Sequence, residues 1–169
     1  MADETTIKTP VQRRQIADYL GTMPAGSATQ TYALMNSGFT AIDESTGVTT
    51  KEKQYVGDKA KTTNISGYNG AFAFTADHIA DQTAVAALAA VAHDQKTGSD
   101  ALFDYVRVDL YATPTTEGKY PARYFLVSAE VTDYKPDDTD MQLSGNLHQI
   151  GDMVPGTFDI TTKTFTKTA

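Results

Sequence analysis

The sequence predicts a mainly β protein of the α+β class, built as a two-sheet β-sandwich or partly open barrel with one flanking α-helix. Three observations predict this class. Apolar and polar residues alternate in several separate segments, which is typical of half-buried strands. Threonine, which favours strands, is frequent. Only one segment has helical apolar periodicity, and strands precede and follow it, so a single layered domain accounts for the order of elements.

The first thirty residues are polar and predict an N-terminal arm, residues 1–30, with little core of its own. Within it, residues 11–20 are predicted to form a short helix that Gly21 and Pro24 would end. We expect the folded domain to span residues 31–160. The alternative for the first residues is a frayed terminus.

Three strands are predicted before the helix. Residues 32–35 and 39–42 are separated by a turn signal, Asn36-Ser37-Gly38, and residues 71–76 alternate strictly. The inward face of the last of these strands comprises Phe72, Phe74 and Ala76.

A long polar segment, residues 43–64, lies between these strands. Lysines are set among acidic residues in it, and Tyr55 and Val56 interrupt it with apolar character. The segment is predicted to be a long hairpin or an extended loop. About 20 residues without a core are uncommon in a compact domain and usually indicate a function or disorder.

The helix is predicted to begin at Gln82 and to end at His93 or Asp94, with Asp81 as its N-cap. Its apolar face comprises Val85, Leu88 and Ala92. Alanine fills most of the other positions, which lets neighbouring elements approach closely.

Four strands are predicted after the helix, at residues 102–111, 122–133, 141–147 and 154–160. A tight polar turn is expected at 135–140 and another turn at 151–152. In the second of these strands the predicted inward residues are Phe125, Val127, Ala129 and Val131. In the third they are Met141, Leu143, Gly145 and Leu147. The chain ends in a β-prone C-terminal arm, residues 161–169, whose one large apolar residue is Phe165.

Composition excludes several classes of function. With 14 basic and 21 acidic side chains the net charge is -7, which disfavours binding to nucleic acid through its phosphates. Without cysteine there is no disulfide, thiolate metal site or thiol nucleophile. The acidic start predicts no signal peptide, and the most apolar stretch, residues 84–92, is too short to span a membrane. We expect a soluble protein made in a cytoplasm, without membrane contact.

No motif predicts catalysis, a cofactor or a metal. His78, His93 and His148 lack metal-ligand spacing. The acidic run at 137–140 departs from a calcium loop and is better explained as a turn. We therefore expect no enzyme activity and no cofactor. Two alternatives remain open: a hydrolase that uses scattered carboxylates, and a carbohydrate-binding β-sandwich on a virion or cell surface. The aromatic residues that motivate the second are Tyr105, Tyr111, Tyr120 and Tyr124.

A series of short motifs, in serial order over most of residues 32–167, resembles the major tail protein (tail tube protein) of long non-contractile-tailed phages, of the lactococcal siphophage type. The motifs are Asn36-Ser37-Gly38-Phe39-Thr40, Asp43-Glu44-Ser45, Lys53-Gln54-Tyr55-Val56-Gly57-Asp58-Lys59, Ile65-Ser66-Gly67-Tyr68, Phe72-Ala73-Phe74-Thr75-Ala76-Asp77, Lys96-Thr97-Gly98, Tyr105-Val106-Arg107-Val108-Asp109, Leu143-Ser144-Gly145-Asn146-Leu147 and Gly156-Thr157-Phe158-Asp159.

The resemblance implies the phage tail tube fold and hexameric rings stacked into a hollow virion tube through which genomic DNA passes at ejection. The implied partners are further copies of the chain, a tape measure protein, a tail terminator and a distal tail protein, and the implied place of assembly is the bacterial host cytoplasm. The long polar segment and the terminal arms would contact neighbouring subunits or rings.

Two sets of residues are candidates for roles in such a tube. Contacts between subunits or rings are expected at Lys51, Lys53, Tyr55, Lys59, Lys61 and Phe165. An acidic tube wall would repel phosphates and let DNA slide without specific binding. The candidate acids for the lumen are Asp43, Glu44, Asp133, Asp137, Asp138 and Asp140. The alternative is an acidic outer surface that aids solubility.

Overall fold

A computed structural model describes residues 9–169 and places ten strands, one α-helix and two short 3-10 helices in that range. The strands before the helix are β1 (Ile16–Gly21), β2 (Tyr32–Leu34), β3 (Phe39–Ser45), β4 (Val48–Lys53), β5 (Thr62–Tyr68) and β6 (Ala71–Asp77). The helix is α1 (Thr83–His93), and the strands after it are β7 (Leu102–Asp109), β8 (Lys119–Asp137), β9 (Asp140–Asp159) and β10 (Thr164–Lys167). The 3-10 helices are η1 (Arg13–Gln15) and η2 (Gly98–Ala101).

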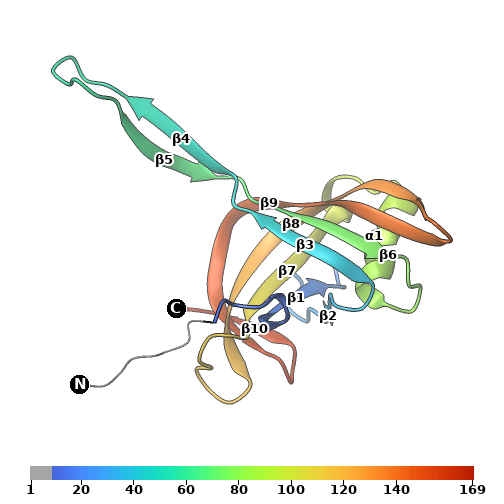
Figure 1. Cartoon of the computed structure of the whole chain (residues 1–169). Helices are drawn as coiled ribbons and strands as arrows, with labels where there is room; N and C mark the ends of the chain where they lie inside the picture. Colours follow the sequence, from blue (N-terminus) through green and yellow to red (C-terminus); the bar gives the residue numbers. More distant parts are fainter. Residues whose placement is uncertain (1–8) are drawn as a thin grey trace.

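Eight strands form one antiparallel sheet in the order β2-β1-β7-β8-β9-β6-β3, with β10 added beside β9. The first and last strands of this order are consecutive in the sequence: β2 ends at Leu34 and β3 begins at Phe39. Because so short a connection spans little distance, the two edges of the sheet must lie near each other. The sheet therefore curls into a partly open barrel, and β4 and β5 form a separate two-stranded sheet outside it (Figure 1).

Both faces of the curled sheet are covered. A large core lies under α1 and includes Phe72, Phe74, Leu88 and Phe125. A smaller core on the other face is built around Phe158. The predicted fold class, mainly β with one flanking helix, is confirmed.

β8 and β9 form the longest hairpin of the described chain, with 19 and 20 residues. A tight turn lies within the predicted range of 135–140 but is shorter, because β8 runs to Asp137 and β9 begins at Asp140. The predicted inward alternation is confirmed at Phe125, Val127 and Ala129, and at Leu143 and Leu147, all of which are buried.

The turn predicted at residues 151–152 is wrong. β9 runs through it, and the register against β8 shifts between Tyr124 and Leu126, opposite Val154 and Ile150. Gly151 has a φ of 71, which permits a bulge without ending the strand.

The short helix predicted at residues 11–20 is also wrong. Residues 13–15 form one 3-10 turn, and residues 16–21 are β1, which pairs with β7 and β2. Tyr19 and Leu20 are buried in the two cores, so pairing with the rest of the sheet overrides the local helical preference. The expected N-terminal arm is therefore shorter than residues 1–30, and its first eight residues lie outside the described part of the chain.

α1 lies where it was predicted and buries Val85 and Leu88. Its N-cap is Gln82 rather than Asp81. No helix between residues 9 and 169 is long and apolar enough to cross a membrane. Part of the expected C-terminal arm folds back on its own domain: β10 pairs with β9, and Phe165 packs against Tyr124 with ring centroids 5.7 Å apart.

Candidate assembly surface

The β4–β5 hairpin projects away from the barrel as an arm, which we define as residues 48–68 (Figure 1). Every residue of β4 is exposed, and β5 is exposed except at Gly67, which is half-buried. Of the two predictions for this polar segment, a long hairpin or an extended loop, the structure has the hairpin. It has no core of its own, and a two-stranded hairpin alone is marginally stable in water.

The two faces of the arm differ in chemistry. Val48 pairs with Tyr68, and Thr50 with Ile65, so these residues share one face. Val48, Ile65 and Tyr68 are 48%, 60% and 62% exposed, which makes this an uncovered apolar face. Sequence reasoning missed it, because a bulge between Thr49 and Thr50 brings Ile65 and Tyr68 onto the same face.

The opposite face of the arm carries Lys51 and Lys53. At the outer turn Tyr55 and Val56 are exposed, and the Lys53 ammonium lies 5.1 Å from the centre of the Tyr55 ring. Lys61 forms an exposed ion pair with Glu52 at 3.5 Å, a geometry that contributes little to stability. The lysines and Tyr55 named as contact candidates therefore all lie on this one projecting element. Phe165 does not, because it packs on the barrel.

The direction of the arm is set at its base by Gly47 and Asn69. The Asn69 amide donates to the Gly47 carbonyl at 2.9 Å. Gly47 has a φ of 60, and a Cβ there would lie 1.9 Å from the Asn69 carbonyl oxygen. Only glycine fits this crossing of the two chains.

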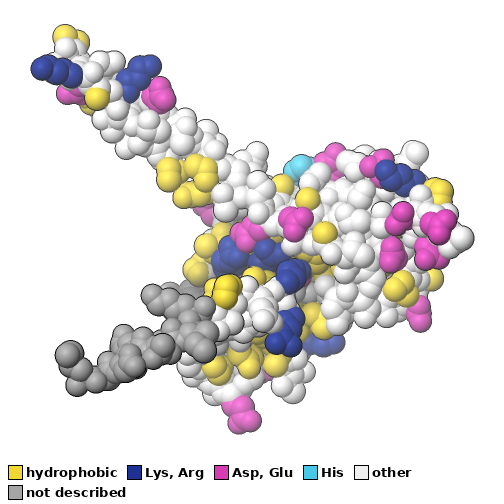
Figure 2. All heavy atoms as spheres, in the orientation of Figure 1, with side chains coloured by type: hydrophobic (Ala, Val, Ile, Leu, Met, Phe, Trp, Pro, Cys, Tyr) yellow, Lys and Arg dark blue, Asp and Glu magenta, His cyan; other side chains and the backbone are white. Residues whose placement is uncertain are grey.

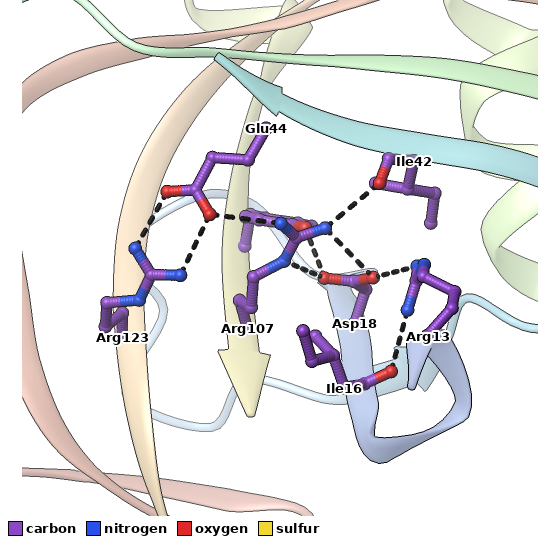
Figure 3. A network of polar contacts seen from close by, with 8 residues as sticks. Arg13, Ile16, Asp18, Ile42, Glu44, Arg107 and Arg123 are labelled. Carbon is purple, nitrogen blue, oxygen red and sulfur yellow. Dashed lines mark hydrogen bonds and ion pairs between the residues drawn. The ribbon is translucent and has the colours of Figure 1, made fainter. Parts of the chain in front are cut away.

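Immediately before the arm, Glu44 enters a network of ion pairs (Figure 3). Its carboxylate accepts hydrogen bonds from the two terminal nitrogens of Arg123 at 2.7 and 2.9 Å, and from Arg107 at 3.1 Å. This bidentate geometry is the strongest that arginine and a carboxylate adopt. These ion pairs connect the end of β3, from which the arm leaves the barrel, to β8 and β7.

Arg107 extends the network across the open edge of the barrel. Its guanidinium donates to Asp18 on β1 at 2.7 Å and to the carbonyl of Ile42 on β3 at 3.2 Å. Asp18, whose side chain is fully buried, also accepts from Arg13 at 2.6 Å and from the hydroxyl of Tyr105. Side chains thus join the edge strand β3 to β1, β7 and β8, strands with which β3 shares no backbone ladder (Figure 3).

The network shifts the pKa values of its members. Burial alone would raise the pKa of Glu44, but the hydrogen bonds and charges of Arg123 and Arg107 outweigh it, so the pKa lies below its ordinary value. The hydrogen bond to Glu44 raises the pKa of Arg123. Burial raises the pKa of the Tyr105 hydroxyl well above its ordinary value. All of these groups keep their usual charge at neutral pH.

The acids named as lumen candidates separate into three places. Asp43 is exposed on β3. Glu44 is ion-paired with Arg107 and Arg123 at the end of β3. The other four are exposed around the turn of the β8–β9 hairpin: Asp133, Asp137, Asp138 and Asp140. Acidic side chains gather at this side of the molecule, away from the arm (Figure 2).

The tyrosines that motivated a carbohydrate-binding surface do not form one. Tyr105 is fully buried, and Tyr124 is half-buried with its hydroxyl donating to Asp104 at 2.6 Å. Tyr111 alone of the four is exposed. Between residues 9 and 169, no three His, Asp or Glu side chains lie close enough together to hold a metal ion.

The fold is similar to that of known tail structures. No protein-family model matches the sequence, and no curated protein is similar to it. A chain of the tail of an empty GTA particle, of C6 symmetry, matches with a TM-score of 0.52 at 9% identity, over 85% of this chain and 97% of that one. A chain of the 6-fold symmetrised baseplate of the anti-feeding prophage (AFP) matches with a TM-score of 0.49 at 8% identity, over 88% of this chain and 97% of that one. The first likeness establishes a shared fold.

Proposed function

We propose that this chain is the structural subunit of a phage tail tube, which polymerises as stacked hexameric rings into a hollow tube that carries genomic DNA during ejection. The main observation that supports this proposal is the arm. Its exposed apolar face and lack of a core are costly in an isolated molecule but are stabilised when a neighbouring copy covers them. The shared fold with a chain of a C6 tail supports it.

The proposal includes the siphophage type and the partners implied by the sequence: a tape measure protein, a tail terminator and a distal tail protein. It includes assembly in the host cytoplasm and a place in the virion, and it assigns the chain no catalysis. Of the acids named for the lumen, Asp43 is the one that is neither paired nor at the β8–β9 turn. DNA would pass it without specific binding.

The test is imaging of the purified chain at high concentration by negative-stain and cryo-electron microscopy. We expect rings or tubes of uniform width. A variant that lacks residues 48–68, with Gly47 joined to Asn69 through a two-residue Asn-Gly turn, should fold as a barrel but form no tubes, because these two residues are already hydrogen-bonded.

The matched control is Gly57→Ala at the outer turn of the arm, where a Cβ would meet nothing within 4 Å. This variant should assemble as the parent does. Tubes formed by the arm-less chain would contradict the role of the arm. A full-length chain that stays monomeric at millimolar concentration would contradict the proposed function itself.

A further inference from the structure

The arm is a basic element of an acidic protein. Between residues 46 and 68 there are four lysines but only two acids, Glu52 and Asp58, whereas the whole chain carries a charge of -7. Lysine side chains, in dark blue, are visible at the outer end of the arm (Figure 2). The arm therefore carries an apolar face, Val48, Ile65 and Tyr68, together with a net positive charge, and Lys51 and Lys53 lie on its opposite face.

The turn region of the β8–β9 hairpin has the complementary character. Residues 133–141, which we call the acidic end, contain Lys135 and four aspartates: Asp133, Asp137, Asp138 and Asp140. All of them are exposed.

An apolar patch lies beside these acids. Ile79, Tyr134 and Met141 are 37%, 38% and 37% exposed. They are neighbours, because the His78 amide donates to the Met141 carbonyl at 2.8 Å and the His78 ring is hydrogen-bonded to the Tyr134 hydroxyl at 2.7 Å. The acidic end thus presents apolar surface bordered by negative charge.

We propose that the arm of one copy docks on the acidic end of a second copy. Apolar surface then covers apolar surface, and the net positive charge of the arm meets the net negative charge of the acidic end, which favours this pairing over a pairing of like charges. The arm and the acidic end point in opposite directions from the barrel (Figure 1), so the arm does not reach the acidic end of its own molecule. The contact is head-to-tail and repeats from copy to copy.

A second copy fits the arm better than nucleic acid does, because an apolar face has no counterpart on a phosphate backbone. The inference rests on the proposed function and deepens it by naming the receiving surface. It also moves Asp133, Asp137, Asp138 and Asp140 from the tube lumen, where the sequence placed them, to the contact between copies.

The experiment is a charge swap read out by sedimentation velocity and electron microscopy. One variant reverses the arm (K51E/K53E/K59E/K61E), a second reverses the acidic end (D133K/D137K/D138K/D140K), and a third combines both. Each reversal alone should raise the concentration needed for assembly by about tenfold or more. The combined variant, and a mixture of the two single variants, should assemble near the wild-type concentration.

The control reverses four exposed acids elsewhere, D94K/D100K/E117K/D152K, with the same change in net charge. It should assemble as the wild type does. If the acidic-end variant behaves like this control while the wild type forms tubes, the proposed contact is wrong and the tube function stands. Failure of the combined variant to recover, with cooperative unfolding intact, also overturns the contact. A monomeric wild type overturns both proposals.

Discussion

Two antiparallel hairpins of this molecule, β8–β9 and β4–β5, have similar backbone geometry but different surroundings. Alternate residues of β8 and β9, such as Val127, Leu143 and Leu147, have no exposed surface. No residue of β4 is even half-buried. The first hairpin is stabilised by the core of its own chain, whereas the second has no such core, and its apolar face has no partner within the described chain.

The arm nevertheless leaves the barrel at a fixed place. Glu44, at the end of β3, forms ion pairs with Arg107 and Arg123, and Gly47 lies close to the Asn69 backbone. The rigid base and the uncovered arm together suit an element that is held ready for a partner, since less ordering entropy is then lost on binding.

Hydrogen exchange measures this difference most directly and should show the largest effect. In dilute monomer, the amides of Val127 and Leu147 should exchange only through global unfolding, whose free energy is about 5–15 kcal/mol in proteins of this kind. The amides of the arm should exchange through local opening, whose free energy is close to zero. Exchange with mass-spectrometric or NMR detection gives both values. Equal protection of the two hairpins in a monomer would show that the arm needs no partner.

Breaking the network that anchors the barrel edge should have the next largest effect. Arg107→Met leaves the buried carboxylate of Asp18 with Arg13 and the Tyr105 hydroxyl as its remaining partners, and removal of one member of a buried ion pair costs about 3–5 kcal/mol. Urea unfolding measures the loss. The control is Lys51→Met on the arm, which should change the free energy of unfolding by less than about 0.5 kcal/mol. Similar losses in both variants would contradict the contrast between barrel and arm.

A change at the base of the arm should have a smaller effect on stability but a large one on assembly. Gly47→Ala places a Cβ against the Asn69 carbonyl in a left-handed conformation, at a cost of about 1–3 kcal/mol. The arm is then redirected, so tubes should be lost. Gly67→Ala is the control, because its Cβ meets nothing within 4 Å. Tubes made by Gly47→Ala would show that the direction of the arm does not matter.

Much of the fold could be predicted because its periodicity is local. Phe72 and Phe74 alternate with the smaller residues Ala73 and Thr75, and the apolar residues of the helix recur at helical spacing, so the class and most strands followed from the pattern. The strand at residues 16–21 could not be predicted, since its identity comes from pairing with β7, a contact across nearly ninety residues.

The candidate assembly surface could be predicted only in part from the sequence. A polar segment with four lysines indicated the arm, but its apolar face depends on the register of β4 against β5. Glu44 was named as a candidate lumen acid, and its ion pairs could not be predicted, because nothing in a linear sequence brings Arg107 and Arg123 beside it. Only the curling of the sheet places β3 next to β7 and β8.

The pH dependence of stability should show the smallest effect, which comes from Glu44. Its pKa is lowered in the folded state, so its contribution to stability is complete above the ordinary glutamate pKa of about 4.3 and is lost as the pH falls through the folded value. Glu44→Gln should therefore be less stable than the wild type at pH 7 by about 1 kcal/mol, a modest figure because the carboxylate is partly exposed. The gap should narrow towards pH 3, since protonation removes the same charge from the wild type. Urea midpoints of both proteins across this range measure the gap. A gap that stays constant or widens on acidification would mean that the charge of Glu44 is not what holds the base of the arm.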